Sequence, residues 1–327
     1  MTTNNSFRVG ITFHSFTNEY CALQWSFEDM MFAASLLGGG VEIVGPAHHR
    51  GFPGVTAEFE RAFKSSVERN QLTPTCYGSY ADPFMLPDRD LTADELFDYT
   101  VPQFKAAARL GFPVVRLQYF TYPIIERLLP WAEKLNIKMG YELHVPLTIE
   151  APQTRTLIEQ VTRIASPHFG LIPDTGIFAR SVPRHFAHFL QEHGVGEKLI
   201  VRAFELWKAK TPQEDAFREL TAIGADKKTI GPIDIIWGSL GHSEPAALAE
   251  IMPYIIHMHG KFFGMVDGDE PYIRFEETVR ALVAGGYKGW ISSEYEGPPV
   301  EDIFAVLREH QAMVHRYQAR YLDARSV

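Results

Sequence analysis

The sequence has little cysteine, no long apolar run and no surplus of basic residues, and each shortage argues against a class of protein. Cys21 and Cys76 are the two cysteines among 327 residues, and neither belongs to a CxxC pair. A disulfide framework or a thiolate zinc site is therefore disfavoured. We expect both thiols to be small buried side chains of a protein in a reducing compartment.

The apolar runs are broken by charge, Gly or Pro well before the ~18 residues that a membrane span requires. The start, MTTNNSFRVG, lacks the basic and apolar segments of a secretion signal. Asp and Glu number 40 against 31 Lys and Arg, so the formal net charge is −9 and the pI is near 5.8. We therefore expect a cytoplasmic protein that binds neither nucleic acid nor membranes, since both need a basic surface.

What the sequence does contain is an eightfold alternation of short apolar runs with longer amphipathic segments. The apolar runs are 9–13, 41–44, 73–77, 114–120, 138–144, 170–173, 255–259 and 290–294, and the clearest helical segments are 27–37, 57–69, 93–110, 124–135, 154–164, 275–284 and 302–321. Strands separated by helices pair in parallel. Without a GxGxxG after the first strand, eight such units predict an α/β protein, a (β/α)8 TIM barrel that forms one domain over residues 1–327.

One stretch of the chain is longer than a single strand–helix unit of the barrel. Residues 178–253 are far more than one helix and its loops require, so we expect an inserted helical and loop region after the sixth strand. Within it, residues 229–240 are rich in Gly, Ile and Trp. We expect these residues to form a loop near the mouth of the active site.

Polar side chains gather where the fifth to eighth predicted strands end, which is where barrel active sites are built. These ends read YELHVP, LIPDTG, IIHMHGKF and SSEYEG. Alternation along a strand places the polar residues of each string on one face. They include Glu142 and His144, then Asp174, then His257, His259 and Lys261, then Glu294 and Glu296. Carboxylates and histidine without thiolate suit Mn2+, Mg2+, Co2+ or Zn2+, and three carboxylates favour a hard ion such as Mn2+.

Taken singly, these residues have other interpretations. Asp174 alone is equally a helix N-cap, and Lys261 alone is a surface lysine. His257 alone is more simply a packed histidine that supports a ligand. His144 lies one pleat farther toward solvent than Glu142, and its ordinary pKa near ~6.5 suits proton transfer. We predict it as the catalytic base, with orientation of Glu142 as its alternative role.

The strings ELHVP, PDTG, HMHGKF and SSEYEG resemble the strand ends of the xylose-isomerase-like barrels, over nearly the whole chain. That superfamily includes sugar and sugar-phosphate isomerases and epimerases. The resemblance implies a metal tetrad of Glu142, Asp174, His259 and Glu294, in which His257 is the alternative to His259. Within the group, HGKF, SEYEG, the chain length and the long region after the sixth strand are most similar to α subunits of bacterial C-glycoside deglycosidases.

This likeness implies a metal-dependent carbon–carbon lyase that acts on 3-oxo C-glucosides of flavonoids and related polyphenols, together with a small β subunit in a hetero-oligomer. The alternative is a sugar or sugar-phosphate isomerase or epimerase that works through a metal-stabilised enediolate. Epimerases of the group usually carry an acidic residue and Arg where this chain has Gly260 to Phe263, which favours the lyase. A DNA-repair barrel is disfavoured by the acidic balance, and a catalytically silent barrel by the intact tetrad.

Either reaction removes a proton beside a carbonyl and needs a base and a Lewis acid. As contacts to the substrate we predict His14, Glu42, Arg116, Gln118, His257, Lys261 and Glu296. As walls of a slot for an aromatic aglycone we predict Tyr119, Phe120, Tyr122, Phe178, Trp237, Phe262 and Phe263.

Overall fold

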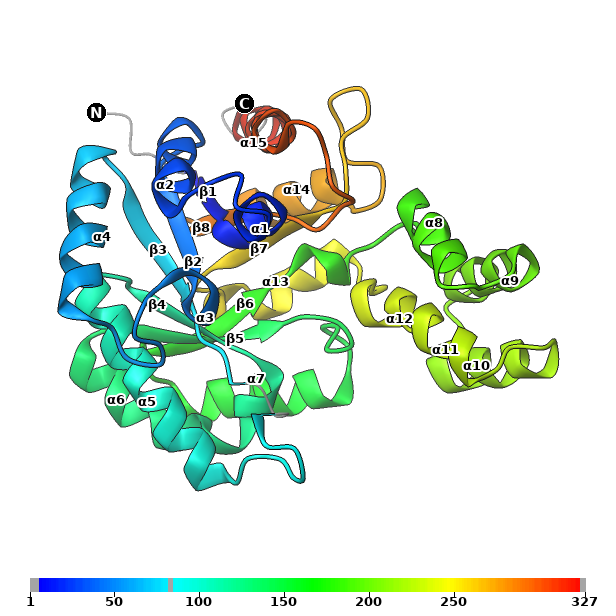
Figure 1. Ribbon diagram of the computed structural model, residues 1–327, viewed down its shortest axis with the longest axis horizontal. Helices are drawn as coiled ribbons and strands as arrows, with labels where there is room; N and C mark the ends of the chain where they lie inside the picture. Colours follow the sequence, from blue (N-terminus) through cyan, green and yellow to red (C-terminus); the bar gives the residue numbers. More distant parts are fainter. Residues whose placement is uncertain (1–5, 82–84, 324–327) are drawn as a thin grey trace.

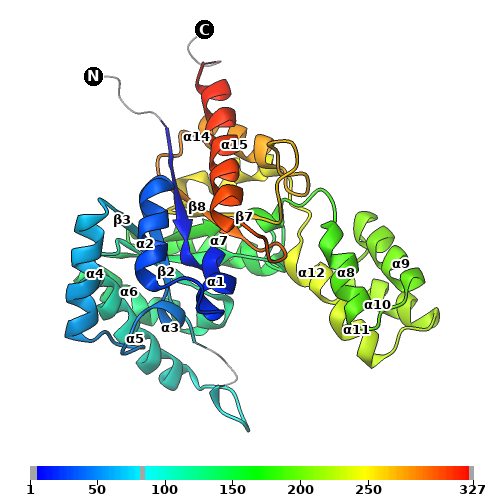
Figure 2. The same cartoon turned by 45° about the horizontal axis from the view of Figure 1, so that its top comes forward.

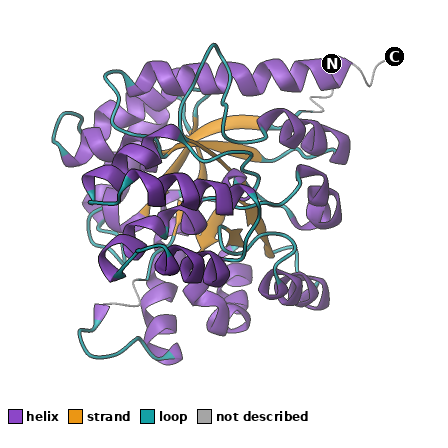
Figure 3. Cartoon of the chain, turned by 90° about the vertical axis from the view of Figure 1, so that its right-hand side faces the viewer, coloured by secondary structure: helices purple, strands orange, loops and turns teal. Residues whose placement is uncertain are grey.

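The computed structural model describes residues 6–81 and 85–323, with the exception of the side chain of Tyr119. Over these residues, eight parallel strands form a nearly closed (β/α)8 barrel in the order β6-β5-β4-β3-β2-β1-β8-β7. The strands are β1 Arg8–Thr12, β2 Gly40–Val44, β3 Thr73–Gly78, β4 Val114–Leu117, β5 Lys138–Leu143, β6 Phe169–Pro173, β7 Met258–Phe262 and β8 Trp290–Tyr295. Figure 3 shows them at the centre of the molecule, enclosed by helices.

The seam of the barrel lies between β6 and β7. Two isolated parallel bridges join this pair, Leu171 with Ile255 and Asp174 with His259. The second bridge lies just beyond β6, at the end where the strands lead into their helices. The seam therefore brings together two residues that the sequence predicts as metal ligands.

Helices cover the outside of the barrel. The main ones are α2 Phe27–Leu36, α4 Ala57–Arg69, α5 Ala93–Leu110, α6 Ile125–Leu135, α7 Pro152–Ile164, α14 Phe275–Gly285 and α15 Ile303–Asp323. Local sequence fixes several of their ends. Thr92 and Glu95 form a capping box at the start of α5, and Gly111, with φ of 88°, ends that helix in the left-handed conformation. Figure 2 shows α15 lying across the barrel strands near the chain termini.

The predicted strands are confirmed, and two of them differ in their bounds by more than one residue. The fourth strand ends at Leu117 rather than at residue 120, because the chain turns into a 3-10 helix, η3 Tyr119–Ile124. The seventh begins at Met258 rather than at residue 255. A 3-10 helix, η6 Met252–Tyr254, precedes it, and Ile255 contributes an isolated bridge in place of a strand.

The expected helical insertion is also confirmed. It consists of α8 Arg184–Glu192, α9 Glu197–Lys208, α10 Gln213–Ala222, α11 Lys227–Ile233 and α12 Ile235–Ser239. We call these five helices the arm, which stands out to one side of the barrel in Figures 1 and 2. At its base, Trp207 stacks on His242, with ring centroids 4.1 Å apart.

The expectation of a loop at residues 229–240 is wrong. The side chain of Asp226 caps α11 by accepting hydrogen bonds from the backbone N–H groups of Lys228 and Thr229. Ile233 and Ile236 then repeat at helical spacing and are fully buried. The apolar residues of this stretch therefore pack helices together and do not form a loop at the mouth.

One hydrophobic cluster runs through the barrel and extends into the arm, where it includes Ile200, Leu206 and Trp207. Among residues 6–81 and 85–323, no helix combines the length and the apolarity that a membrane span requires.

Candidate metal centre and active site

The polar residues at the ends of β5 to β8 converge inside the barrel mouth. Across the seam, Asp174 is bridged to His259, and in the ladder of β7 and β8, Lys261 is paired with Glu294. Glu142, Asp174, His259 and Glu294 are all buried. A parallel barrel brings the carboxyl ends of its strands to one rim, so side chains far apart in the sequence meet there.

Two carboxylates lie beside one histidine nitrogen, and a third carboxylate lies near one of them. The Nδ1 atom of His259 is 3.1 Å from Oε1 of Glu142 and 3.0 Å from Oε2 of Glu294. Donor atoms of Glu142, Asp174 and His259 all lie within 4.8 Å of one another. One nitrogen and several oxygens directed at one place form a donor set that suits a hard or borderline divalent cation.

Asp174 supports this fit because its two oxygens have different surroundings. Oδ1 accepts a hydrogen bond of 2.6 Å from the backbone N–H of Gly176, so Asp174 does cap the 3-10 helix η4 Thr175–Ile177. Oδ2 is buried and, among the described residues, has no hydrogen-bond partner, although the ammonium of Lys261 lies 3.4 Å away. Capping and metal binding are thus compatible, and Oδ2 is the oxygen left for a cation.

Burial and mutual repulsion make this cluster electrostatically expensive without a cation. Burial raises the pKa of Asp174 to about 6, against the lowering effect of Lys261. Burial would also raise the pKa of Glu142, but Arg116 and His259 lower it to about 2. For His259, burial favours the neutral form, yet the charges of Glu294, Glu42 and Glu142 hold its pKa well above the usual range. A divalent ion here would neutralise the excess negative charge.

His144 is held by two hydrogen bonds that define its tautomer. Its Nε2 lies 2.7 Å from Nζ of Lys261, and its Nδ1 lies 2.8 Å from the carbonyl oxygen of Val145. Burial would lower the pKa of Lys261, but Asp174 and Glu296 raise it, so the amine is charged and donates. Nε2 of His144 is therefore the acceptor, and Nδ1–H donates to Val145. Glu142 is supported by Arg116 instead, through an Nη1–Oε2 contact of 2.6 Å.

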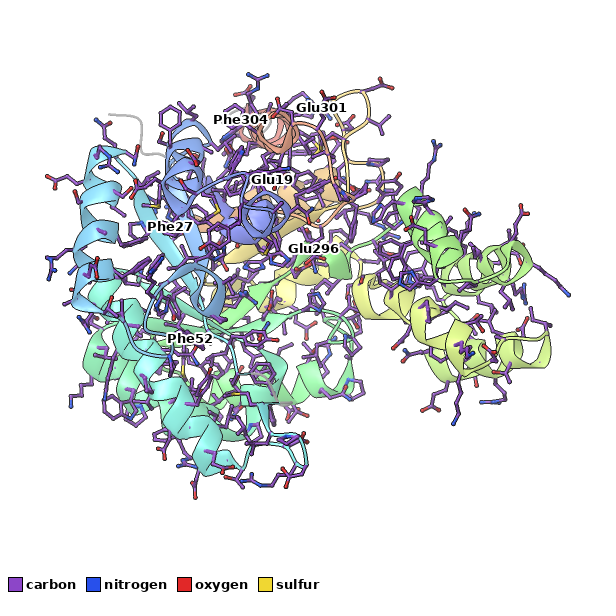
Figure 4. All side chains as sticks on the ribbon, in the orientation of Figure 1. Glu19, Phe27, Phe52, Glu296, Glu301 and Phe304 are labelled. Carbon is purple, nitrogen blue, oxygen red and sulfur yellow. The ribbon has the colours of Figure 1, made fainter. Side chains whose placement is uncertain are left out.

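The charged residues continue from Lys261 toward the exposed rim. Nζ of Lys261 is 3.1 Å from Oε2 of Glu296, and Oε1 of Glu296 is 3.7 Å from Nε2 of His14. His14 is well exposed, whereas Lys261 is fully buried. Figure 4 labels Glu296 near the centre of the view. A chain of ionisable groups thus connects the buried Lys261 with solvent.

A cavity of about 510 Å³ opens over these groups. Its volume lies in the range of roughly 300–1,000 Å³ that is typical of small-molecule sites. Its walls are formed by His14, Val44, Tyr80, Arg116, Gln118, Glu142, His144, Val145, Pro146, Leu147, Lys261, Glu294 and Glu296. Five of the predicted substrate contacts are among them: His14, Arg116, Gln118, Lys261 and Glu296. Glu42 and His257 lie fully buried and are not among these walls.

The prediction of an aromatic slot is wrong for three of its phenylalanines. Phe178, Phe262 and Phe263 are buried away from the cavity. Phe262 stacks on His310 under α15, with centroids 4.0 Å apart, and Phe263 packs on Phe186 of the arm. Phe262 alternates with the inward-facing residues of β7, so its ring faces the surrounding helices, whereas Phe263 lies just beyond the end of the strand.

Of the other predicted aromatics with a described side chain, Trp237, Tyr122 and Phe120 are not among the walls of the cavity. Trp237 packs edge-on against Phe217 inside the arm, and Tyr122 packs in the same way against Tyr141. Phe120 reaches the site only indirectly, through an edge contact with Tyr80. The side chain of Tyr119 lies outside the described residues.

The apolar wall is made instead by Val44, Tyr80, Val145, Pro146 and Leu147. One of these five residues, Tyr80, has an aromatic ring, so the pattern of aromatic residues in the sequence does not reveal them. All of them lie within a few positions of the ends of β2, β3 and β5. Position after a strand end was therefore the signal that would have found them.

The barrel and the buried polar residues at the ends of β5 to β8 define a (β/α)8-barrel protein with a candidate metal centre. No family model matches the chain. Among solved structures, it is similar to D-psicose 3-epimerase from Clostridium cellulolyticum H10, with a TM-score of 0.55, 14% identity and 97% of each chain covered. It is also similar to 3-keto-D-glucoside 4-epimerase from E. coli, with a TM-score of 0.54, 12% identity, and 95% and 100% covered. These likenesses concern the fold.

Relatives in sequence are more specific. The 3'-dehydrocarminate deglycosidase alpha subunit of Microbacterium sp. is 36% identical over 307 residues, which cover 89% of this chain and 88% of the relative. A C-glycoside deglycosidase alpha subunit of Arthrobacter globiformis is 33% identical over 325 residues, with 93% and 89% covered. The chain belongs to the family of C-glycoside deglycosidase alpha subunits, and it is an enzyme. The predicted resemblance to this family is confirmed.

Proposed function

We propose that this enzyme is a metal-dependent lyase that splits the carbon–carbon bond between sugar and aglycone in 3-oxo C-glucosides of aromatic compounds. The observation that carries the proposal is the composition of the cavity. Its lining combines the candidate ligands Glu142 and Glu294 and the base His144 with the apolar surface of Tyr80, Val145, Pro146 and Leu147. A polar sugar bonded to a flat apolar group matches such a divided surface.

Glu142, Asp174, His259 and Glu294 would hold the cation, through Oε1, Oδ2, Nδ1 and Oε2 respectively. Mn2+ is the ion that the donor set favours, although Mg2+, Co2+ and Zn2+ also suit it. When bound, a divalent cation supplies positive charge beside the oxygens on which negative charge develops during the reaction. Arg116 keeps Oε2 of Glu142 occupied, so that Oε1 remains free.

His144 would act as the base. The ketone acidifies the proton on the neighbouring sugar carbon, and Nε2 of the neutral imidazole accepts that proton. The electrons of the broken C–H bond form a carbon–carbon double bond in the sugar, and the bond to the aglycone breaks. The electron pair of the broken carbon–carbon bond stays with the aglycone and takes up the proton that His144 accepted, directly or through water, so the elimination is balanced and the base is restored. For this step Nε2 must exchange its hydrogen bond to Lys261 for one to the substrate.

Polar residues on the cavity wall would orient the sugar. Arg116, Gln118, Lys261, Glu296 and His14 all offer groups for hydroxyls. Gln118 is the strongest candidate because its Oε1 is buried and, in the described part of the chain, has no hydrogen-bond partner. An unpaired buried acceptor is costly, and a sugar hydroxyl would satisfy it.

The alternative is an isomerase or epimerase of a sugar or sugar phosphate, since that chemistry also begins with removal of a proton beside a carbonyl. The metal ligands and His144 would serve it equally well. The apolar wall favours the lyase, because a free sugar has no apolar group to place against Tyr80 and Leu147.

We further propose that the enzyme works in the cytoplasm with a small β subunit. The relatives are named alpha subunits, which implies a partner in each of those proteins. On the arm, Val201 and Ile223 are exposed apolar residues beside one another. They are candidates for the contact.

The function is tested by incubating the Mn2+-loaded protein, with and without a small subunit encoded beside it, with an oxidised C-glucoside and separately with ketohexoses. Chromatography follows release of the aglycone and interconversion of the ketoses. We expect aglycone release and no ketose turnover. Rapid epimerisation of a free ketose without aglycone release would establish the alternative.

A further inference from the structure

We propose that Glu42 is a positioning residue of the metal centre, which accepts the Nε2–H of His259 and so leaves the Nδ1 of His259 to face the ion. This inference rests on the metal centre of the proposed function. It assigns Glu42 a role different from the substrate contact that the sequence suggests.

Glu42 reaches His259 across the interior of the barrel. It lies in the middle of β2, whereas His259 lies in β7, and these strands are not neighbours in the sheet. Its two carboxylate oxygens are 2.9 and 3.1 Å from Nε2 of His259. Both side chains are fully buried, so solvent does not compete for this contact.

The two nitrogens of an imidazole ring have different capacities. In the neutral ring one nitrogen carries the proton and the other carries the lone pair. An ionised carboxylate can only accept, so the nitrogen beside Glu42 is the one that donates. The lone pair is then at Nδ1, on the side where Glu142 and Glu294 lie. Metal-binding histidines commonly donate their other N–H to a carboxylate, which fixes both the tautomer and the orientation of the ring.

Glu42 is itself held in place. Nε of Arg116 lies 3.3 Å from its Oε1, and Nε2 of His257 lies 3.3 Å from its Oε2. The same Arg116 donates to Oε2 of Glu142. One guanidinium therefore orders both the carboxylate that supports the histidine and a carboxylate that faces the ion.

Glu42, Cys76 and His257 also bring three potential metal donors within 4.8 Å of one another. This group does not suit an ion, because Arg116 already places a positive charge beside Glu42 and both oxygens of Glu42 have partners. Burial, together with the charge of Glu42, holds the pKa of the Cys76 thiol well above its usual value. The thiolate that a metal requires is thus disfavoured, and support of His259 is the role that remains.

The test measures the affinity of metal-free protein for Mn2+ by isothermal titration calorimetry. Glu42→Gln keeps the shape of the side chain but removes the charge, and its amide can present N–H to Nε2. We expect the dissociation constant to rise by about 10- to 100-fold, with one ion still bound per chain. Ser292→Ala is the matched control. Ser292 is buried in the same interior and hydrogen-bonds to His257 at 2.9 Å, and this variant should bind Mn2+ like the wild type.

A second variant separates the hydrogen bond from the charge. Glu42→Asp keeps the charge but is one methylene too short to reach Nε2, so its affinity should also fall. Wild-type affinity in Glu42→Asp, or in Glu42→Gln, would overturn the proposal, as would an equal loss in Ser292→Ala. If the wild-type protein binds no divalent ion, it is the proposed metal centre that fails, and the two results are therefore distinguishable.

Discussion

At the scale of single residues, His144 is the clearest case in which surroundings decide chemistry. A histidine at a strand end is an ambiguous signal in sequence. Its hydrogen bonds to Lys261 and Val145 place the basic nitrogen at Nε2, at the wall of the cavity. Support of Glu142, the alternative role, is provided by Arg116.

Removing His144 should therefore separate metal binding from proton transfer. We expect His144→Ala to bind one Mn2+ per chain, while kcat falls by about 10²- to 10⁴-fold. Metal analysis and steady-state kinetics on the same preparation measure both. His193→Ala, on the arm, is the control and should match the wild type. Loss of the metal in His144→Ala would show that the residue is a ligand or supports one.

His310 gives a residue-scale prediction about stability. It is fully buried between Phe262 and Phe275, and burial lowers its pKa to about 3. The unfolded chain has the ordinary value near ~6.5, so below that pH the unfolded state binds more protons and folding loses stability. The contribution is fully present above pH ~6.5 and is lost as pH falls toward the folded pKa.

Between pH 7.5 and pH 5.0, the lowered pKa of His310 should reduce the free energy of unfolding by about 2 kcal/mol. In urea unfolding of metal-free protein, His310→Gln should lose about that much less stability over this interval than the wild type. His315→Gln, at an exposed position of the same helix, should keep the wild-type dependence. Equal pH dependence in His310→Gln and wild type would contradict the burial argument.

At the scale of elements, strand periodicity predicted the residues of the cavity better than the occurrence of aromatic residues near strand ends did. Apolar runs and helical spacing located the eight strands and seven outer helices, and alternation placed Glu142 with His144, and Glu294 with Glu296, on the faces that line the cavity. What sequence could not supply were contacts between strands that are not neighbours. Glu42 of β2 with His259 of β7, and Lys261 of β7 with His144 after β5, depend on barrel closure.

The aromatic residues show the same limit. Phe262 and Phe263 lie beside inward-facing residues in sequence, but the pleat and the helices of the arm decide which way their rings turn. Residues 229–240 were misjudged because a stretch rich in Gly, Ile and Trp suggested a loop, while buried isoleucines at helical spacing determined the fold. Tertiary packing overrode local propensity in both cases.

Because Tyr80 lines the cavity and Phe263 does not, substitutions at these two residues should have different kinetic effects. Tyr80→Ala should raise the KM for the oxidised C-glucoside with little change in kcat, since Tyr80 contacts the apolar part of the substrate in both ground and transition states. Phe263→Leu, in contrast, should lower the unfolding temperature and leave KM unchanged, because its ring packs on Phe186. Steady-state kinetics and thermal unfolding of both variants make the comparison. The reverse pattern would restore the slot that the sequence suggests.

At the scale of the whole molecule, the barrel contains the candidate active site, whereas the arm adds exposed helical surface outside it. The described cavity is lined by residues from the barrel strands and their loops, and none of its walls comes from α8 to α12. The arm is instead anchored at its base and extends away from the barrel (Figure 1). We propose this projecting helical element, which has no part in the cavity, as the place where a partner subunit binds.

The central claim is that one divalent ion, held at the ends of four strands, is required for release of the aglycone. The most direct test titrates metal-free protein with Mn2+ while aglycone release from a 3-oxo C-glucoside is followed. Activity should rise from near zero and level off at one ion per chain, and Asp174→Ala should neither retain the ion nor recover activity. Full activity in chelator-treated, metal-free protein, or in Asp174→Ala, would contradict the account.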